Sequence, residues 1–115
     1  AYSLSKLCDA MLSQELHARY GGDASRLTGQ LTFNSMDPTS QIGLGADTKM
    51  LRAGWGSWGA PASQATISAE MIAGAAWEGR SGEGFSSRRE IADTAARRQL
   101  WDECVRLTGA VFPDD

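Results

Sequence analysis

Tyr2 and Lys6, four residues apart near the start of the sequence, are the two side chains best suited to acid–base chemistry. Positions i and i+4 lie one turn apart on the same face of a helix, so the phenol and the ammonium would be neighbours. A nearby cation favours the ionised form of a phenol, and a helix N-terminus adds a partial positive charge with the same effect. The spacing predicts a proton donor and acceptor for a carbonyl or alcohol oxygen. A boundary tyrosine beside a solvated lysine is the alternative interpretation.

A helix over residues 2–20 is expected to position this pair. Apolar residues recur in it at helical spacing, and a glycine pair follows it. These apolar positions are Leu4, Leu7, Cys8, Met11, Leu12, Leu16 and Tyr20. Residues 31–36 are predicted to form a short strand that Asp37 and Pro38 end. A helix followed by a buried strand is the αβ unit of a parallel sheet.

Four further elements are expected along the rest of the chain. Residues 39–61 are predicted to form a loop, residues 62–77 a helix, and residues 82–87 a short strand. Residues 93–108 are predicted to form a last helix, which Asp93 would cap. The buried stripe of this last helix is expected to be Leu100, Trp101, Cys104, Val105 and Leu107.

Composition narrows the class of protein only slightly. The 115 residues suit one small domain, and a net charge of -3 indicates neither disorder nor nucleic-acid binding. No apolar run is long enough to span a bilayer. Cys8 and Cys104 lie in no paired-cysteine motif, which favours reduced thiols of an intracellular protein, with a disulfide as the alternative. His17 has no second histidine or cysteine at ligand spacing, so no metal site is predicted.

The start of the chain also resembles a known family. The stretch Ala1-Tyr-Ser-Leu-Ser-Lys-Leu-Cys-Asp-Ala-Met-Leu-Ser-Gln-Glu-Leu-His17 is similar to the active-site helix of the short-chain dehydrogenase/reductases. The family motif is Tyr-x-x-x-Lys, usually written with a serine before the lysine, as Ser5-Lys6 stands here. The resemblance is to the retinol-dehydrogenase-like and protochlorophyllide-reductase-like branch.

Later segments resemble the same family in the same order. Asn34-Ser-Met-Asp-Pro is similar to Asn-x-x-Asp-Pro-Gly, with Thr39 at the glycine position. Thr48-Lys-Met-Leu is similar to the motif that follows directly in the family, whereas an insertion precedes it here. Gly82-Glu-Gly-Phe resembles the last strand of the family, and residues 98–109 resemble the ending of the retinol-dehydrogenase-like branch.

This resemblance implies an α/β fold class for residues 1–115. The chain would be the C-terminal part of a single short-chain dehydrogenase domain, a portion of a Rossmann-like parallel sheet with flanking helices. It would be incomplete without an N-terminal nucleotide-binding half. Because the tyrosine lies past the midpoint of such a domain, the chain is expected to begin in mid-protein, and any targeting segment would be missing.

The activity that the resemblance implies is hydride transfer between NADP or NAD and an apolar alcohol or carbonyl compound. Tyr2 and Lys6 would be the catalytic residues. Lys6 would also contact the cofactor, together with Pro38, Thr39 and Thr48. Trp55 and Trp58 would line a substrate lid, or would only fix a loop to the domain. The choice between NADP and NAD stays open, because the discriminating residues would lie upstream.

Three interpretations of the whole chain therefore stay open. It is a fragment of an oxidoreductase that needs its missing half or a partner chain, a non-catalytic interaction module or subunit of an assembly derived from a dehydrogenase, or a truncated gene product. Tyr2 and Lys6 favour the first. Thr39, the insertion and Gly84 favour the second. A homo-oligomer is a further expectation, and no nucleic-acid partner is expected.

Overall fold

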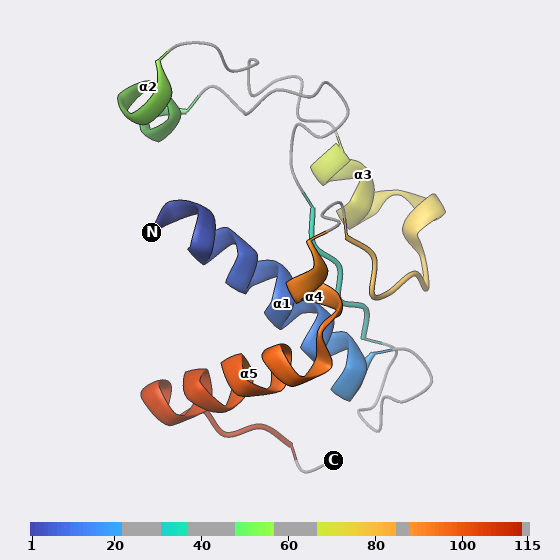
Figure 1. The fold of residues 1–115 in the computed structure, drawn as a ribbon. Coiled ribbons are helices and arrows are strands. Elements are labelled where there is room, and N and C mark those ends of the chain that lie inside the picture. Colours follow the sequence, from blue (N-terminus) through green and yellow to red (C-terminus); the bar gives the residue numbers. More distant parts are fainter. Residues whose placement is uncertain (22–30, 37–47, 57–66, 85–87, 114–115) are drawn as a thin grey trace. The chain divides into compact units, whose positions relative to one another are not determined.

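The computed structural model describes residues 1–21, 31–36, 48–56, 67–84 and 88–113 (Figure 1). In chain order their elements are α1 (Tyr2–Tyr20), α2 (Lys49–Trp55), α3 (Ile67–Ala73), the 3-10 helix η4 (Ala75–Trp77), α4 (Arg89–Ala92) and α5 (Thr94–Thr108). The chain forms two compact units. The first unit consists of Ala1–Ser35 and Gly79–Asp115, and the second is Met36–Glu78.

The predicted parallel sheet is wrong, because the described residues are helical and contain no strand. Residues 31–36 have no regular secondary structure. They still meet the segment after Gly79 through two backbone hydrogen bonds, from the Gly82 N–H to the Phe33 carbonyl (2.8 Å) and from the Ser35 N–H to the Glu83 carbonyl (3.0 Å). The predicted α/β class, a portion of a Rossmann-like sheet, is therefore corrected to an all-helical arrangement over this part of the chain.

Gly82 explains why the predicted strand over 82–87 does not form in the part of it that is described. Its φ of 76° lies in the left-handed region, which turns the chain away from the extended path of a strand. Residues 82–84 are irregular, and residues 85–87 lie outside the described ranges.

Helix α1 has the same bounds as the helix predicted over 2–20. Its sequence holds neither glycine nor proline, so nothing interrupts the backbone ladder before Gly21, whose N–H donates to the His17 carbonyl. Met11 and Tyr20 of the predicted apolar stripe are buried. Leu4 is exposed instead, because the packing of α1 involves the part of the helix that follows its first turn.

Helix α5 begins where the sequence predicts it. The Asp93 side chain accepts a hydrogen bond from the Ala96 N–H at 3.0 Å, which satisfies a backbone donor of the first turn. Gly109, with φ 67°, ends the helix in a left-handed conformation. Trp101 is buried, but Leu107 is 68% exposed, so its place in the predicted stripe is wrong. Six residues rotate a side chain by about 240° from Trp101, which carries Leu107 off the buried face.

The first unit is held by α1, which packs against both α4 and α5 (Figure 1). Three aromatic rings close one end of this packing, and the centroids of Trp101 and Phe112 lie 4.4 Å apart. Tyr20 lies 6.4 Å from each of these two rings, and its hydroxyl donates to the Pro113 carbonyl at 3.3 Å. The residues after α5 are thus tied back onto the end of α1.

The second unit contains short helices in its described part. α2 lies inside the range predicted as a loop over 39–61, and that prediction is wrong for residues 49–55. Lysine, methionine, leucine, arginine and alanine follow one another there, and all five favour a helix. Thr48 immediately precedes α2, and its carbonyl accepts the Arg52 N–H at 3.0 Å.

The helix predicted over 62–77 is present as two shorter pieces. α3 ends at Ala73, and the extended backbone of Gly74 (φ -82°, ψ 131°) separates it from η4. Residues 62–66 lie outside the described ranges. None of the described helices is both long and apolar enough to cross a lipid bilayer.

Candidate functional site

Tyr2 and Lys6 lie one turn apart on α1, as their spacing predicts. The Lys6 Nζ is 5.9 Å from the centroid of the Tyr2 ring. The same ammonium forms an ion pair with Asp9, with 3.1 Å between Nζ and Oδ2. Tyr2 is 43% exposed. The structure thus brings a phenol, an ammonium and a carboxylate together in the first half of one helix.

The donors and acceptors of this group suit a polar ligand that carries hydroxyl groups. A lysine ammonium offers three N–H donors, of which the contact with Asp9 uses one. A phenol can both give and accept a proton at an oxygen atom. The described residues hold no glycine-rich turn that opens a helix, of the kind that cradles a pyrophosphate.

Of the remaining predicted site residues, two belong to the second unit and three lie outside the described ranges. Thr48 belongs to the second unit, before α2. Trp55 is the last residue of α2. Pro38, Thr39 and Trp58 lie outside the described ranges. The assignment of these five residues to cofactor and lid stays a prediction.

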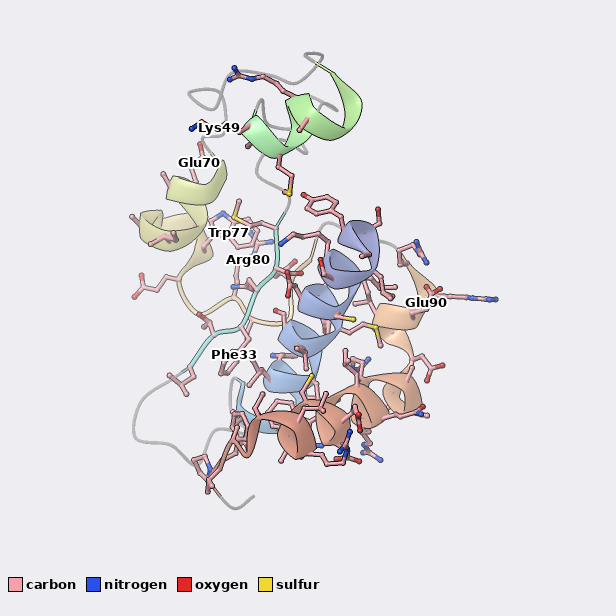
Figure 2. All side chains as sticks on the ribbon, turned by 90° about the vertical axis from the view of Figure 1, so that its left-hand side faces the viewer. Phe33, Lys49, Glu70, Trp77, Arg80 and Glu90 are labelled. Atoms are coloured by element: carbon pink, nitrogen blue, oxygen red, sulfur yellow. The ribbon has the colours of Figure 1, made fainter. Side chains whose placement is uncertain are left out.

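A polar cluster that the sequence did not predict joins α1 to the two irregular segments of the first unit. Ser81 Oγ accepts a hydrogen bond from the Phe33 N–H at 2.9 Å and lies 2.8 Å from His17 Nδ1. Gln14 Nε2 donates to the Gly82 carbonyl at 2.6 Å. Figure 2 labels Phe33 on the first of these segments and Arg80 on the second. No local signal marks the cluster, because its members are 48 to 68 residues apart.

Asn34 completes the same cluster from residues 31–36. Its Oδ1 accepts the Glu83 N–H at 3.0 Å, and its Nδ2 donates to the Arg80 carbonyl at 3.0 Å. One amide side chain therefore satisfies a donor and an acceptor on the opposite segment, in place of the ladder that a strand pair would supply.

The contact between Ser81 and His17 raises the question of a serine nucleophile. Acyl transfer also needs N–H donors directed at a developing oxyanion. The two N–H groups nearest in sequence, those of Gly82 and Glu83, are already bound to the Phe33 carbonyl and the Asn34 side chain. The contacts make the cluster a clamp that fixes the turn over residues 79–83.

A buried carboxylate is the second feature that the sequence did not predict. Glu15 is 2% exposed and lies between two arginines, with 2.8 Å to Arg19 Nε and 3.4 Å to Arg97 Nε. Arg97 also donates to the Ile91 carbonyl at 2.7 Å, and the Arg19 guanidinium lies 4.7 Å from the ring centroid of Trp101. Glu15 and Arg19 are four residues apart, a spacing that does signal a helical ion pair. Arg97 has no such local signal.

Metal-ligating residues do not gather in the part of the chain that the structure describes. Cys8 and Cys104 are free and half-buried. Comparisons with known protein families, with curated proteins and with solved structures find no match to this chain.

Proposed function

We propose that this chain supplies the proton-transferring pair of an NAD(P)-dependent oxidoreductase that moves hydride between a nicotinamide and an apolar alcohol or carbonyl compound. The observation that supports this proposal is the position of the Lys6 ammonium, 5.9 Å from the Tyr2 ring centroid and one turn away on α1. The resemblance of this helix to the active-site helix of the short-chain dehydrogenase/reductases supports the same class of reaction.

Each residue has a separate role in this proposal. Tyr2 gives its proton to the developing alkoxide during reduction and takes it back during oxidation. Lys6 donates to the hydroxyls of the nicotinamide ribose through its ammonium N–H groups. The cofactor, when bound, supplies or accepts the hydride.

Catalysis by Tyr2 and Lys6 requires that water be excluded from the pair. A developing oxyanion is stabilised strongly only where water is excluded, and both Tyr2 and Lys6 are exposed on α1. A further segment or a partner chain must therefore cover the pair. The same segment or chain would carry the phosphate-binding part of the cofactor site.

The test uses the full product of the gene that encodes this sequence, with apolar aldehydes and ketones as substrates and NADPH or NADH as reductant. We expect turnover that Tyr2→Phe abolishes while cofactor binding, measured by calorimetry, is kept. Ser3→Ala, a change of the neighbouring exposed residue, is the matched control and keeps both. Near-normal turnover by Tyr2→Phe would contradict the role of Tyr2.

The second candidate is a non-catalytic interaction module. Tyr2 and Leu4, 43% and 63% exposed in the first turn of α1, are apolar groups that a protein partner would bury. An interaction module would bind neither nucleotide, and Leu4→Ser would weaken its partner complex. The oxidoreductase is expected to bind NADPH or NADH. A measurement of nucleotide binding therefore separates the two candidate functions.

A further inference from the structure

We propose that the second unit, Met36–Glu78, is an insertion whose two ends are held together by residues of the first unit. The clamp between residues 33–35 and 80–83 then acts as a conformational device, because it lets the first unit keep its fold when the second unit unfolds or is lengthened. This inference does not rest on the proposed function.

The first unit is discontinuous in the sequence. The chain leaves it after Ser35 and returns to it at Gly79. A compact unit accommodates an insertion when the points where the chain leaves and returns lie close together at its surface. The contacts of the residues beside these two points therefore decide whether the second unit is an insertion of this kind.

Asn34 joins the two ends of the insertion directly. It stands one residue before Ser35, and its Nδ2 donates at 3.0 Å to the carbonyl of Arg80, the residue that follows Gly79. The Ser35 N–H donates to the Glu83 carbonyl, also at 3.0 Å. These bonds connect residues on both sides of the insertion, and none of their atoms belongs to the second unit.

Helix α1 fixes the returning segment from within the first unit. Gln14 Nε2 donates to the Gly82 carbonyl at 2.6 Å, and His17 Nδ1 lies 2.8 Å from Ser81 Oγ. α1 in turn packs against α4 and α5, while α3 packs against η4 within the second unit. Each unit therefore has packing of its own, as expected for parts of a chain that open separately.

A longer insertion should cost the first unit little stability. The free energy needed to close a flexible loop grows only with the logarithm of its length, so about ten added residues change the folding equilibrium by less than about twofold. The same residues added inside the clamp would instead separate Ser81 from Gly82 and disturb the bonds that join the two ends.

The first experiment adds about ten glycine and serine residues after Gly56 in the 115-residue chain and measures hydrogen exchange by NMR. The Glu83 and Arg97 amides report on the first unit, because the Asn34 side chain and the Asp93 carbonyl accept their hydrogens. We expect both exchange rates to change by less than about twofold. Exchange at either amide that is faster by about tenfold would overturn the proposal.

The matched control places the same residues between Ser81 and Gly82. This insert should speed exchange at the Glu83 amide by about tenfold, because it breaks hydrogen bonds of the clamp. An unchanged rate would show that the clamp does not hold the ends of the insertion, which would also overturn the proposal.

The second experiment compares proline at two exposed helical positions, because proline inside a helix breaks it. Ile72 is 86% exposed on α3 of the second unit, and Arg98 is exposed on α5 of the first. Ile72→Pro should leave exchange at the Glu83 and Arg97 amides within about twofold, whereas Arg98→Pro should speed both by more than about tenfold. Faster exchange in Ile72→Pro would mean that the two units unfold together, and unchanged exchange in Arg98→Pro would mean that the clamp is not part of the first unit's fold. Either result would overturn the proposal.

Discussion

Glu15 Oε2 lies 3.4 Å from Arg97 Nε, and this contact joins α1 to α5 across 82 residues of sequence. The carboxylate is almost fully buried, and its other oxygen accepts from Arg19. A buried carboxylate is tolerated only when its charge is paired and its oxygens are hydrogen-bonded. The two arginines meet both conditions, so the pair fixes how these two helices of the first unit pack.

Replacing this carboxylate should be strongly destabilising. Glu15→Gln keeps the size of the side chain but leaves two partly buried arginines without their counter-ion, and we expect a loss of about 3 kcal/mol. Urea unfolding measures it. Asp102→Asn, a change of an exposed acid on α5, is the control and should leave the midpoint nearly unchanged. A Glu15→Gln midpoint equal to that of the unsubstituted chain would contradict the structural role of this ion pair.

A change of Asn34 tests the polar cluster through a single backbone amide, the N–H of Glu83. Asn34→Ala removes the acceptor of the Glu83 N–H and should lower stability by about 1 to 2 kcal/mol. Hydrogen exchange at the Glu83 amide should become faster. Asn34→Asp keeps the acceptor oxygen and loses only the donor to Arg80, so it should keep the Glu83 amide protected. Fast exchange in both variants would show that the acceptor oxygen does not protect this amide.

Gly79 and Gly82 share a left-handed backbone conformation but differ in the space that a Cβ atom would find. They therefore serve as a matched pair for substitution by alanine. Gly79 and Gly82 have φ values of 73° and 76°, so alanine at either site costs about 1 to 2 kcal/mol of backbone strain. A Cβ at Gly82 would lie 2.5 Å from His17 Cδ2, whereas a Cβ at Gly79 would meet nothing within 4 Å. Gly82→Ala should therefore be the more destabilising of the two in urea unfolding.

The excess cost of Gly82→Ala should disappear when the ring it meets is removed. In the background of His17→Ala, the two glycine variants should lose the same stability, because only backbone strain remains. A persistent difference between them would mean that the His17 ring does not lie against Gly82.

The end of α5 carries a pair whose titration can be followed directly. Arg106 donates two hydrogen bonds to Glu103, at 2.8 Å and 2.5 Å, and these bonds hold the pKa of the Glu103 carboxyl below its ordinary value. A lowered pKa in the folded chain contributes stability that is present above the ordinary value and is lost as the pH falls through the lowered one. Arg106→Gln should return the Glu103 pKa towards the ordinary value and remove this part of the acid dependence.

Carbon-13 NMR titration of the Glu103 carboxyl measures this shift residue by residue. Arg98→Gln, an exposed change on the same helix, is the control and should leave the Glu103 pKa where it is. The same lowered pKa in the Arg106→Gln chain would mean that the hydrogen bonds from Arg106 are not its cause.

Local signals in the sequence were sufficient for the two long helices. The bounds of α1 and the cap of α5 by Asp93 follow from spacing and from side chains within a few residues. The spacing of Tyr2 and Lys6 placed them as neighbours for the same reason. The spacing alone does not predict a catalytic role for these two residues.

Contacts between segments far apart in the sequence could not be predicted from local patterns. The predicted sheet required residues 31–36 to find a strand partner, and the structure satisfies them instead through Asn34, Ser81 and two backbone bonds to the turn at Gly82. The burial of Glu15 depends on Arg97, far along the chain. Strand pairing and buried charge both depend on partners that local periodicity does not reveal.

The central claim is that Tyr2 and Lys6 serve a nicotinamide cofactor. Calorimetric titration of the full gene product with NADPH and NADH tests it most directly, with Lys6→Ala compared against Arg98→Ala. The proposal predicts micromolar binding of one of the two nucleotides, weakened by Lys6→Ala and unchanged by Arg98→Ala. Absence of binding at millimolar nucleotide would contradict the proposal. Equal dissociation constants for Lys6→Ala and Arg98→Ala would contradict it as well.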